Sequence, residues 1–471
     1  MTVSPLLLQA EQAVLTLLWA YLKLLLAAGL VATASTLIGL KLGFLLRLYT
    51  WLLLYLFEWG THHTTIYDEE EENQARSKAV IPRAKVRSTV KHGLIHVDAA
   101  EALKHKLTTG NSGPADQALN YLTLVTGDIS DYIKAGFETV IQDEVGTAFE
   151  SEELPCWNLL SRTMRAYPYM RWRLRSLWVF GFFIRYLVLF PVRLALYLFG
   201  LLFLGLGTLL ILAVPRSHSW HERLAAYFSI VSFRLMGKAA SMLARYHNPE
   251  NRPRGGTICV ANHTSPYDIL VLNADSCYSL TGQKHGGMLG YIEEALHRLT
   301  PHLWFERENA KDRKFVLDSM KDHLLNPRNP PILIFPEGVC VNNTAVVLFR
   351  KGCFEAATTV HPVAIRYDAK FCDAYWIQDT WFMYLFSLMT SWSVVCDVWF
   401  LPPMHIKAGQ SAAEFADEVK AAISEAAGLR FLVWDGRMKQ YVVKAETIEN
   451  AKRLYSERLI KQAALCSPDF T

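Results

Sequence analysis

This chain of 471 residues lacks paired cysteines and carries little net charge. Its eight cysteines show no Cys-x-x-Cys spacing and no disulfide-like density, so we expect reduced thiols and no metal site. The formal net charge of +4 is too small for a chain of this size to indicate a nucleic-acid partner. These absences disfavour two classes of protein, the disulfide-linked secreted modules and the nucleic-acid-binding proteins.

Charged residues are also scarce in two long apolar segments, which indicate a membrane protein. Residues 6–59 contain only five charged side chains, and residues 24–40 form an uncharged run near the lower limit for crossing a bilayer. The segment is too long for a cleaved signal peptide and has no small-residue cleavage site, so we predict a retained anchor at residues 1–60. The second segment spans residues 177–214, and its uncharged part, residues 194–214, is just long enough to cross.

Arg185, Pro191 and Arg193 interrupt the second apolar segment. Charges inside a bilayer are costly, so we expect this interruption to lie near an interface or to face protein. Basic residues flank the segment on both sides, which by the positive-inside tendency places both flanks in the cytosol. We therefore predict a membrane hairpin, with its basic flank, at residues 161–216 and a cytosolic location for the soluble remainder.

An α/β domain is predicted at residues 217–445. An amphipathic helix is expected from Leu224 to Leu243, and a second one between the capping box that starts at Ser411 and the stop signal at Gly428. The strand candidates are short apolar runs typical of a sheet covered on both faces, namely residues 257–261, 331–335, 360–367 and 394–401.

Two more segments complete the predicted organisation. Residues 61–160 are interpreted as a polar linker with an acidic run at residues 68–72, followed by an amphipathic helix at residues 131–144. Residues 446–471 form a C-terminal tail.

The first candidate catalytic patch is the heptad from Asn262 to Asp268, which follows a predicted strand. A neutral imidazole such as that of His263 is a competent base near pH 7, and it works best when a carboxylate such as Asp268 fixes its tautomer. A purely structural role, with Asp268 capping the next helix and His263 filling a turn, is an equal alternative for this patch alone.

Three further patches favour the catalytic alternative. Glu337 and Gly338 end a predicted buried strand, where α/β folds commonly present functional side chains. Arg307 follows two aromatic residues and is of the type that binds phosphate, and Lys351 adds a second cation. Pro362 lies near the entry of another predicted strand, where no ladder hydrogen bond is lost.

These patches resemble the four blocks of the glycerolipid acyltransferases that carry a His-x-x-x-x-Asp signature. The matching blocks are residues 262–268 (NHTSPYD), 304–307 (WFER), 335–338 (FPEG) and 361–365 (HPVAI). Longer stretches are similar to the endoplasmic-reticulum type of glycerol-3-phosphate acyltransferase, at residues 153–162, 335–344, 349–352 and 390–404. The resemblance implies an α/β acyltransferase domain with a mixed sheet covered by helices, joined to N-terminal and central membrane-embedded helices.

The resemblance also implies a reaction and the roles of the site residues. A fatty acyl group would pass from acyl-CoA to the sn-1 hydroxyl of glycerol 3-phosphate, giving lysophosphatidic acid. His263 would be the general base, Asp268 would orient it, and Arg307 would bind the acceptor phosphate. The remaining predicted substrate-binding residues are Glu337, Gly338, Lys351 and Pro362, of which Lys351 rests on its charge and position. Acyl-CoA is a substrate in this scheme, and no cofactor is implied.

One departure from the family pattern concerns the acceptor loop. Val339 stands where that subgroup has threonine, so we expect the loop to be held otherwise and the acceptor preference to differ there. Two alternatives stay open, a lysophospholipid acyltransferase and a non-catalytic lipid-binding protein. The resemblance implies the endoplasmic-reticulum membrane, crossed several times or entered by a hairpin, and a cytosolic active site. It leaves association with lipid droplets and the oligomeric state open.

Overall fold

A computed structural model describes most of the chain and divides it into two compact units. The described residues are 5–38, 43–78, 146–152, 157–160, 172–215, 220–284, 286–305, 310–377, 380–441 and 453. One unit comprises Met1–Gln74 with Ser151–Gly436, and the other comprises Ala75–Glu150 with Arg437–Thr471. The candidate site belongs to the first unit. The helix predicted at residues 131–144 lies outside the described residues.

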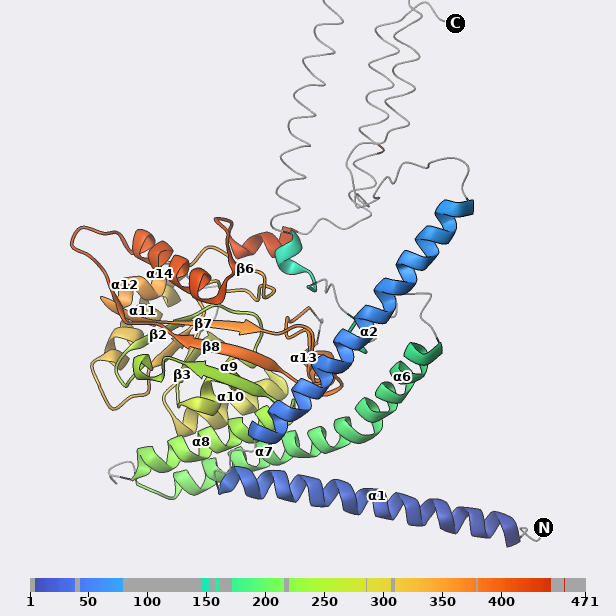
Figure 1. The fold of residues 1–471 in the computed structure, drawn as a ribbon. Coiled ribbons are helices and arrows are strands. Elements are labelled where there is room, and N and C mark those ends of the chain that lie inside the picture. Colours follow the sequence, from blue (N-terminus) through green and yellow to red (C-terminus); the bar gives the residue numbers. More distant parts are fainter. Residues whose placement is uncertain are drawn as a thin grey trace, which may run out of the picture. The chain divides into compact units, whose positions relative to one another are not determined.

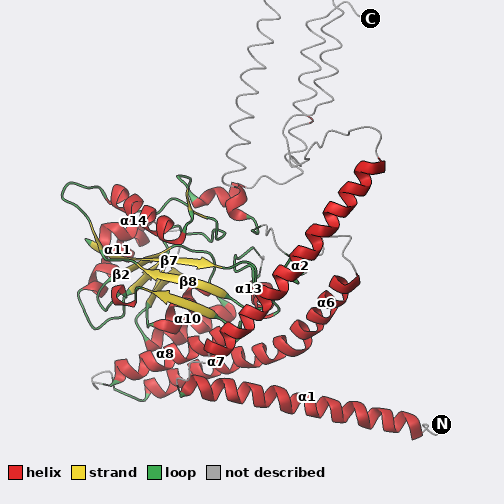
Figure 2. Ribbon diagram, viewed as in Figure 1, coloured by secondary structure: helices red, strands yellow, loops and turns green. Residues whose placement is uncertain are grey.

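The first unit is built around a mixed sheet (Figures 1 and 2). Its order is β1-β8-β7-β2-β5-β3-β4, with β9 paired to β7, and a separate pair joins β10 to β6. Most neighbours run parallel, and β8 and β9 run antiparallel to β7. The strands are β1 (Leu243–His247), β2 (Ile258–Ala261), β3 (Ser279–Gln283), β4 (Leu303–Phe305), β5 (Ile332–Ile334), β6 (Ala345–Val346), β7 (Thr359–Tyr367), β8 (Val395–Phe400), β9 (Met404–His405) and β10 (Arg430–Phe431).

Helices cover both faces of the sheet. The first face packs against α7 (Phe190–Leu212), α8 (His221–Lys238), α9 (Tyr267–Asp275), α10 (Gly287–Leu299) and α13 (Trp381–Met389). The second face packs against α11 (Ala310–Leu324), α12 (Gly352–Ala356) and α14 (Ala412–Ala427).

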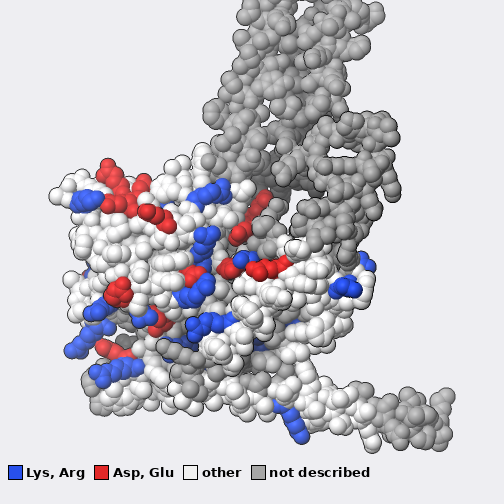
Figure 3. Space-filling view, viewed as in Figure 1, with Lys and Arg blue, Asp and Glu red and all other residues white. Residues whose placement is uncertain are grey.

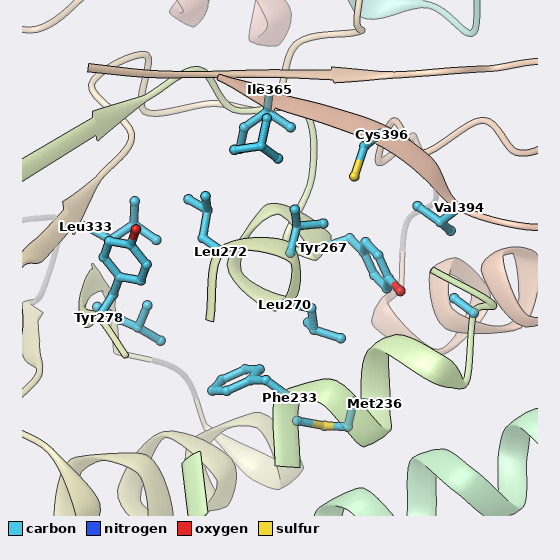
Figure 4. Close-up of a cluster of buried hydrophobic side chains, with 14 of the residues drawn as sticks. Phe233, Met236, Tyr267, Leu270, Leu272, Tyr278, Leu333, Ile365, Val394 and Cys396 are labelled. Atoms are coloured by element: carbon cyan, nitrogen blue, oxygen red, sulfur yellow. The ribbon is translucent and has the colours of Figure 1, made fainter. Parts of the chain in front are cut away.

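The alternation of side chains along the strands produces these two cores. In β2, Cys259 and Ala261 point to the first core, whereas Ile258 and Val260 point to the second. All four side chains are fully buried, so the strand has the continuous apolar character of a strand covered on both faces. Figure 4 shows part of the first core, where Leu333 and Ile365 from the sheet face Phe233 and other helical side chains.

The predicted fold class and the four predicted strands are confirmed, and they correspond to β2, β5, β7 and β8. The capping box at Ser411 is also present, and α14 ends at Gly428 in the left-handed conformation. One helix was predicted too long. The helix from Leu224 ends with α8 at Lys238, and Leu243 begins β1, because its backbone pairs with Val395 of β8.

Among the described residues, two helices are long and apolar enough to cross a bilayer, at Leu15–Leu37 and Trp172–Leu212. The first belongs to α1 (Pro5–Leu37). The second joins α6 (Trp172–Phe183), a π-helical segment (Ile184–Leu189) and α7 without a break. At a rise of 1.5 Å per residue it extends over about 60 Å, twice the thickness of a hydrocarbon core.

The predicted membrane hairpin is therefore wrong. Pro191 does not start a turn, because the π-helical segment directly before it accommodates the missing N–H within the helix. Arg185 and Arg193 are 4% and 2% exposed, and both donate hydrogen bonds to backbone carbonyls of residues 389–392. The expectation that this interruption faces protein is confirmed.

The acidic run at residues 68–72 is helical. It lies within α2 (Gly43–Lys78), which begins in the first apolar segment and continues into the predicted linker. Leu53 and Phe57 of α2 are buried and pack with Trp157 and Trp392, so this helix is attached to the first unit.

Candidate active site at the carboxyl ends of β2 and β5

The loops that follow β2 and β5 leave the sheet side by side. Strands β2 and β5 are adjacent and parallel, with Val260 opposite Ile334. Parallel neighbours present their carboxyl ends at the same edge, so the residues after Ala261 and those after Ile334 meet there. The Val341 amide donates a 2.8 Å hydrogen bond to the His263 carbonyl, which joins the two loops directly.

His263 and Asp268 form the expected pair. The His263 Nδ1 lies 2.9 Å from Asp268 Oδ2. The imidazole is 17% exposed and stacks on the Phe335 ring, with centroids 4.2 Å apart, whereas the Asp268 side chain is fully buried. Because Nδ1 faces the carboxylate, Nε2 is the nitrogen that would take a proton from a substrate, and the Cys340 side chain also hydrogen-bonds the imidazole.

Asp268 is itself held by four donors. Its Oδ2 accepts hydrogen bonds from the backbone amides of Thr264 and Ser265 as well as from His263, and its Oδ1 accepts one of 2.6 Å from the Tyr367 hydroxyl. The carboxylate lies in the first turn of α9, so it does stabilise the strand-to-helix turn. The contacts of this side chain therefore both stabilise the turn and fix the direction of the imidazole ring.

Glu337 holds the backbone of the same histidine. Its Oε1 accepts a 2.7 Å hydrogen bond from the His263 amide, and its Oε2 accepts one of 3.0 Å from the Val347 amide. The side chain is only 1% exposed. This geometry gives Glu337 a positioning role between three loops rather than a place on the open surface of the site.

The titration of these groups is shifted by their surroundings. Burial lowers the pKa of the His263 imidazole, but the contacts with Cys340 and Asp268 outweigh it, so this pKa lies above its ordinary value. Burial raises the pKa of the Glu337 carboxyl to about 7, although the two backbone amides oppose that shift. The His263 imidazole is therefore more basic than an ordinary histidine, and less of it is in the neutral form at neutral pH.

The Arg350 side chain lies beside the turn at Gly338, which has a positive φ of 65°. The Arg350 guanidinium packs against this turn, because a Cβ at residue 338 would lie 3.0 Å from its Cζ. The Lys351 side chain is 67% exposed and forms an ion pair of 3.0 Å with Glu355. Sequence reasoning selected Lys351 of these two cations, whereas Arg350 is the one in contact with the loop.

Val339 is held by packing against the segment after α14. We call residues 428–436 the C-terminal strap. Its backbone pairs with residues 344–348 through β10 and β6, and Lys420 Nζ donates a 3.0 Å hydrogen bond to the Leu432 carbonyl. A Cβ at Gly436 would collide with a Val339 methyl group, so the valine fills the space left by the glycine. The loop is thus held by apolar contact at Val339, the position where the acyltransferase subgroup that the sequence resembles has a threonine hydroxyl.

The other predicted residues have separate outcomes. Arg307 lies outside the described residues. Pro362 is buried in the interior of β7 and does not lie at its entry. It lies opposite Val260 of β2, at the point where the antiparallel partner of β7 changes from β9 to β8. Asn262 was not selected, yet its buried amide exchanges two hydrogen bonds with the Ile365 backbone and extends the β2 pairing.

Within the described part of the chain, no three His, Cys, Asp or Glu side chains are grouped to hold a metal ion.

Comparison with known proteins gives three results. Residues 244–366 match the family model described as "Acyltransferase". The chain is 40% identical over 437 residues to "Glycerol-3-phosphate acyltransferase 3" of Danio rerio, which covers 92% of this chain and 93% of that protein. It is 39% identical over 419 residues to "Glycerol-3-phosphate acyltransferase 4" of Homo sapiens, and the aligned region covers 88% of this chain and 89% of that protein.

Among solved structures, the lysophosphatidic acid acyltransferase PlsC of Thermotoga maritima is similar with a TM-score of 0.42 and 14% identity, over 52% of this chain and 96% of that chain.

Proposed function

The chain belongs to the glycerol-3-phosphate acyltransferase family, and we propose that it moves a fatty acyl group from acyl-CoA to the sn-1 hydroxyl of glycerol 3-phosphate. The predicted enzyme class, an acyltransferase of this family, is confirmed by the relatives. The acyl-CoA donor, the sn-1 position and the product lysophosphatidic acid are our proposal. The observation that supports it most is the His263–Asp268 pair at the strand end, in which Nδ1 faces the carboxylate and Nε2 is the nitrogen that would take the hydroxyl proton.

The proposed reaction needs no acyl-enzyme intermediate. His263 Nε2 takes the proton of the acceptor hydroxyl as its oxygen attacks the thioester carbonyl carbon. The C–S bond then breaks, and the CoA thiolate leaves with the proton that His263 carried. Asp268 stabilises the imidazolium formed between these steps. No cofactor takes part in this scheme.

The acceptor phosphate would be bound by the cations around the Gly338 turn. Arg350 packs against this turn, and a guanidinium offers two parallel donors to phosphate oxygens. Arg307 keeps the role that its motif implies, and the Lys351 side chain is 67% exposed. Gly338 contributes the tight turn that brings the backbone close to the ligand.

We further propose that the enzyme works at the endoplasmic-reticulum membrane with its site facing the cytosol. The two apolar helices support membrane attachment. A membrane location would also supply the long acyl chain of the donor and receive the lipid product.

The proposal is tested with membranes that contain the protein, labelled acyl-CoA and one acceptor at a time. We expect labelled lysophosphatidic acid from glycerol 3-phosphate. Product from lysophosphatidic acid alone would replace the proposal by the lysophospholipid acyltransferase alternative. Absence of turnover with every acceptor would favour the non-catalytic alternative.

The His263→Ala variant separates catalysis from membrane attachment. We expect it to lose activity by about 100-fold or more, since a positioned general base contributes about that much. Its amount in the membrane fraction should stay unchanged. Retained activity would mean that another group removes the hydroxyl proton.

A further inference from the structure

Helix α13 exposes apolar side chains although it belongs to the α/β domain. Its sequence, WFMYLFSLM, contains no charged residue. Phe382 and Met383 are 69% and 52% exposed, and Ile377 just before the helix is 49% exposed. Isolated apolar side chains on a surface are ordinary, but a contiguous group of large ones indicates an interaction surface. We call Ile377, Phe382 and Met383 the α13 surface.

The carboxyl-terminal half of α13 is fixed to the long apolar helix at Trp172–Leu212. The Phe386 ring contacts the rings of Tyr186 and Phe190, with centroid distances of 6.0 Å and 5.1 Å. Arg193 donates a hydrogen bond of 2.9 Å to the Met389 carbonyl, at the last residue of α13. Arg185 donates one of 3.0 Å to the next carbonyl, that of Thr390. The middle of the long helix is therefore attached to the carboxyl end of α13.

These arginines explain how a charged segment can remain within an apolar helix. A helix C-terminus carries partial negative charge and leaves carbonyl groups without intrahelical partners, so two guanidinium groups fit there. The same long helix exposes apolar side chains on its free surface, including Phe183, Leu187 and Leu198 at 51%, 56% and 55%. Figure 3 shows few charged side chains along the long helices, whereas many lie over the α/β domain.

Helix α13 also reaches the candidate active site. Tyr384, next to the exposed Met383, is 1% exposed and donates a 3.2 Å hydrogen bond to the Ala374 carbonyl. Its hydroxyl also contacts the Ser265 side chain, in the loop between His263 and Asp268. One face of this short helix is thus in contact with the catalytic loop, while the opposite face is open.

We propose that the α13 surface inserts into the lipid bilayer that holds the long apolar helix. The surface is continuous with that helix through Phe386, Arg185 and Arg193, so both meet the same apolar medium. A protein partner would be expected to meet charged groups at the rim of the surface, whereas α13 has no charged residue among its nine. Trp376 and Trp381, which pack against Tyr384, have the amphipathic rings that favour a membrane interface.

This contact would place the catalytic loop directly at the membrane surface. A long acyl chain could then stay in lipid while its thioester reaches His263. The insertion itself does not depend on the reaction, and it can be tested without measuring turnover.

The test uses the full-length protein with the photoreactive residue p-benzoylphenylalanine at position 382 or 383. It is reconstituted in phosphatidylcholine vesicles that contain a radiolabelled phosphatidylcholine and is then irradiated. The matched control carries the same residue at Ala421, which is exposed on α14 at the second face of the sheet. A reference position is Leu198, on the exposed side of α7.

We expect labelled lipid on the protein from positions 382, 383 and 198, and at least tenfold less from position 421. Lipid adducts at 198 without adducts at 382 and 383 would overturn the proposal. So would a cross-linked protein dimer from position 382, because it would identify a second copy as the occupant. Absence of adducts at all four positions would overturn it as well, since the long helix would then not lie in lipid. Acyltransferase activity is measured separately on the same samples, so a failure of the proposed reaction would not be confused with any of these results.

Discussion

The loops after β2 and β5 differ in what their carboxylates hold, although both serve His263. Asp268, in the first loop, contacts the imidazole nitrogen and is satisfied by side-chain and backbone donors. Glu337, in the second loop, accepts hydrogen bonds from the backbone amides of His263 and Val347. Asp268 fixes the orientation of the imidazole ring, whereas Glu337 fixes the position of the His263 backbone.

The difference predicts that the same chemical change affects stability at Glu337 more than at Asp268. Replacing a carboxylate by a carboxamide keeps one acceptor oxygen and converts the other into a donor. At Asp268, the new donor would face the Tyr367 hydroxyl, which can rotate and accept. At Glu337, the new donor would face a backbone N–H that cannot change its role.

Asp268→Asn is expected to have the largest effect on rate. The fold should be retained, because the amide oxygen can accept from His263, Thr264 and Ser265. The charge that stabilises the imidazolium is lost, so we expect kcat to fall by about 100-fold or more. The melting temperature, measured in detergent, should fall little. A large loss of melting temperature would remove the contrast with Glu337.

Glu337→Gln is expected to affect stability as well as rate. A buried N–H without an acceptor costs about 1 to 3 kcal/mol. Because that N–H belongs to His263 or Val347, we expect kcat to fall by about tenfold as the base is displaced. The measurement is the melting temperature together with kcat, compared with Asp268→Asn. An unchanged melting temperature would contradict the role assigned to Glu337.

The pH dependence of stability gives a second readout for Glu337. Its pKa in the folded protein, about 7, exceeds the ordinary value of 4.5, so the folded state binds this proton more tightly than the unfolded state. The resulting stabilisation is present below pH 4.5 and is lost as the pH rises through 7. Glu337→Gln should flatten this decline.

The pH profile of activity tests the surroundings of His263. The base acts in its neutral form, and its pKa is raised above the ordinary 6.5. We expect kcat/KM to keep rising above pH 7.5, by up to about tenfold per pH unit, where an unshifted histidine would already give a plateau. Viscosity-independent rates would verify that the chemical step is observed. A plateau reached below pH 7 would contradict the raised pKa.

Gly436→Ala is expected to have the smallest effect of the series. The new methyl group would collide with Val339 and displace the loop that holds Glu337. Overpacking of this kind costs about 1 to 3 kcal/mol, and we expect kcat/KM to fall by about threefold. Adding Val339→Ala should restore the rate because it removes the colliding methyl group. If the double variant is as impaired as Gly436→Ala alone, the strap does not act through Val339.

Much of the sheet and part of the site could be predicted from the sequence because their signals are local. Continuous apolar runs predicted β2, β5, β7 and β8, and the capping box predicted α14. His263 and Asp268 are five residues apart, so one strand-to-helix turn suffices to bring them together. Strands β1 and β3 were missed, because partners distant in sequence and not their own pattern make them strands.

The sequence by itself determined the apolar segments, the alternation of side chains across the sheet and the residue types available for catalysis. Only the tertiary structure decided that Arg185 and Arg193 bind the end of α13, which keeps Trp172–Leu212 as one helix instead of a hairpin. It also decided that Glu337 faces the His263 backbone and that Gly436 receives Val339. Each of these contacts joins residues at least 70 positions apart, and a buried charge or amide takes whichever partner the packed chain brings within reach.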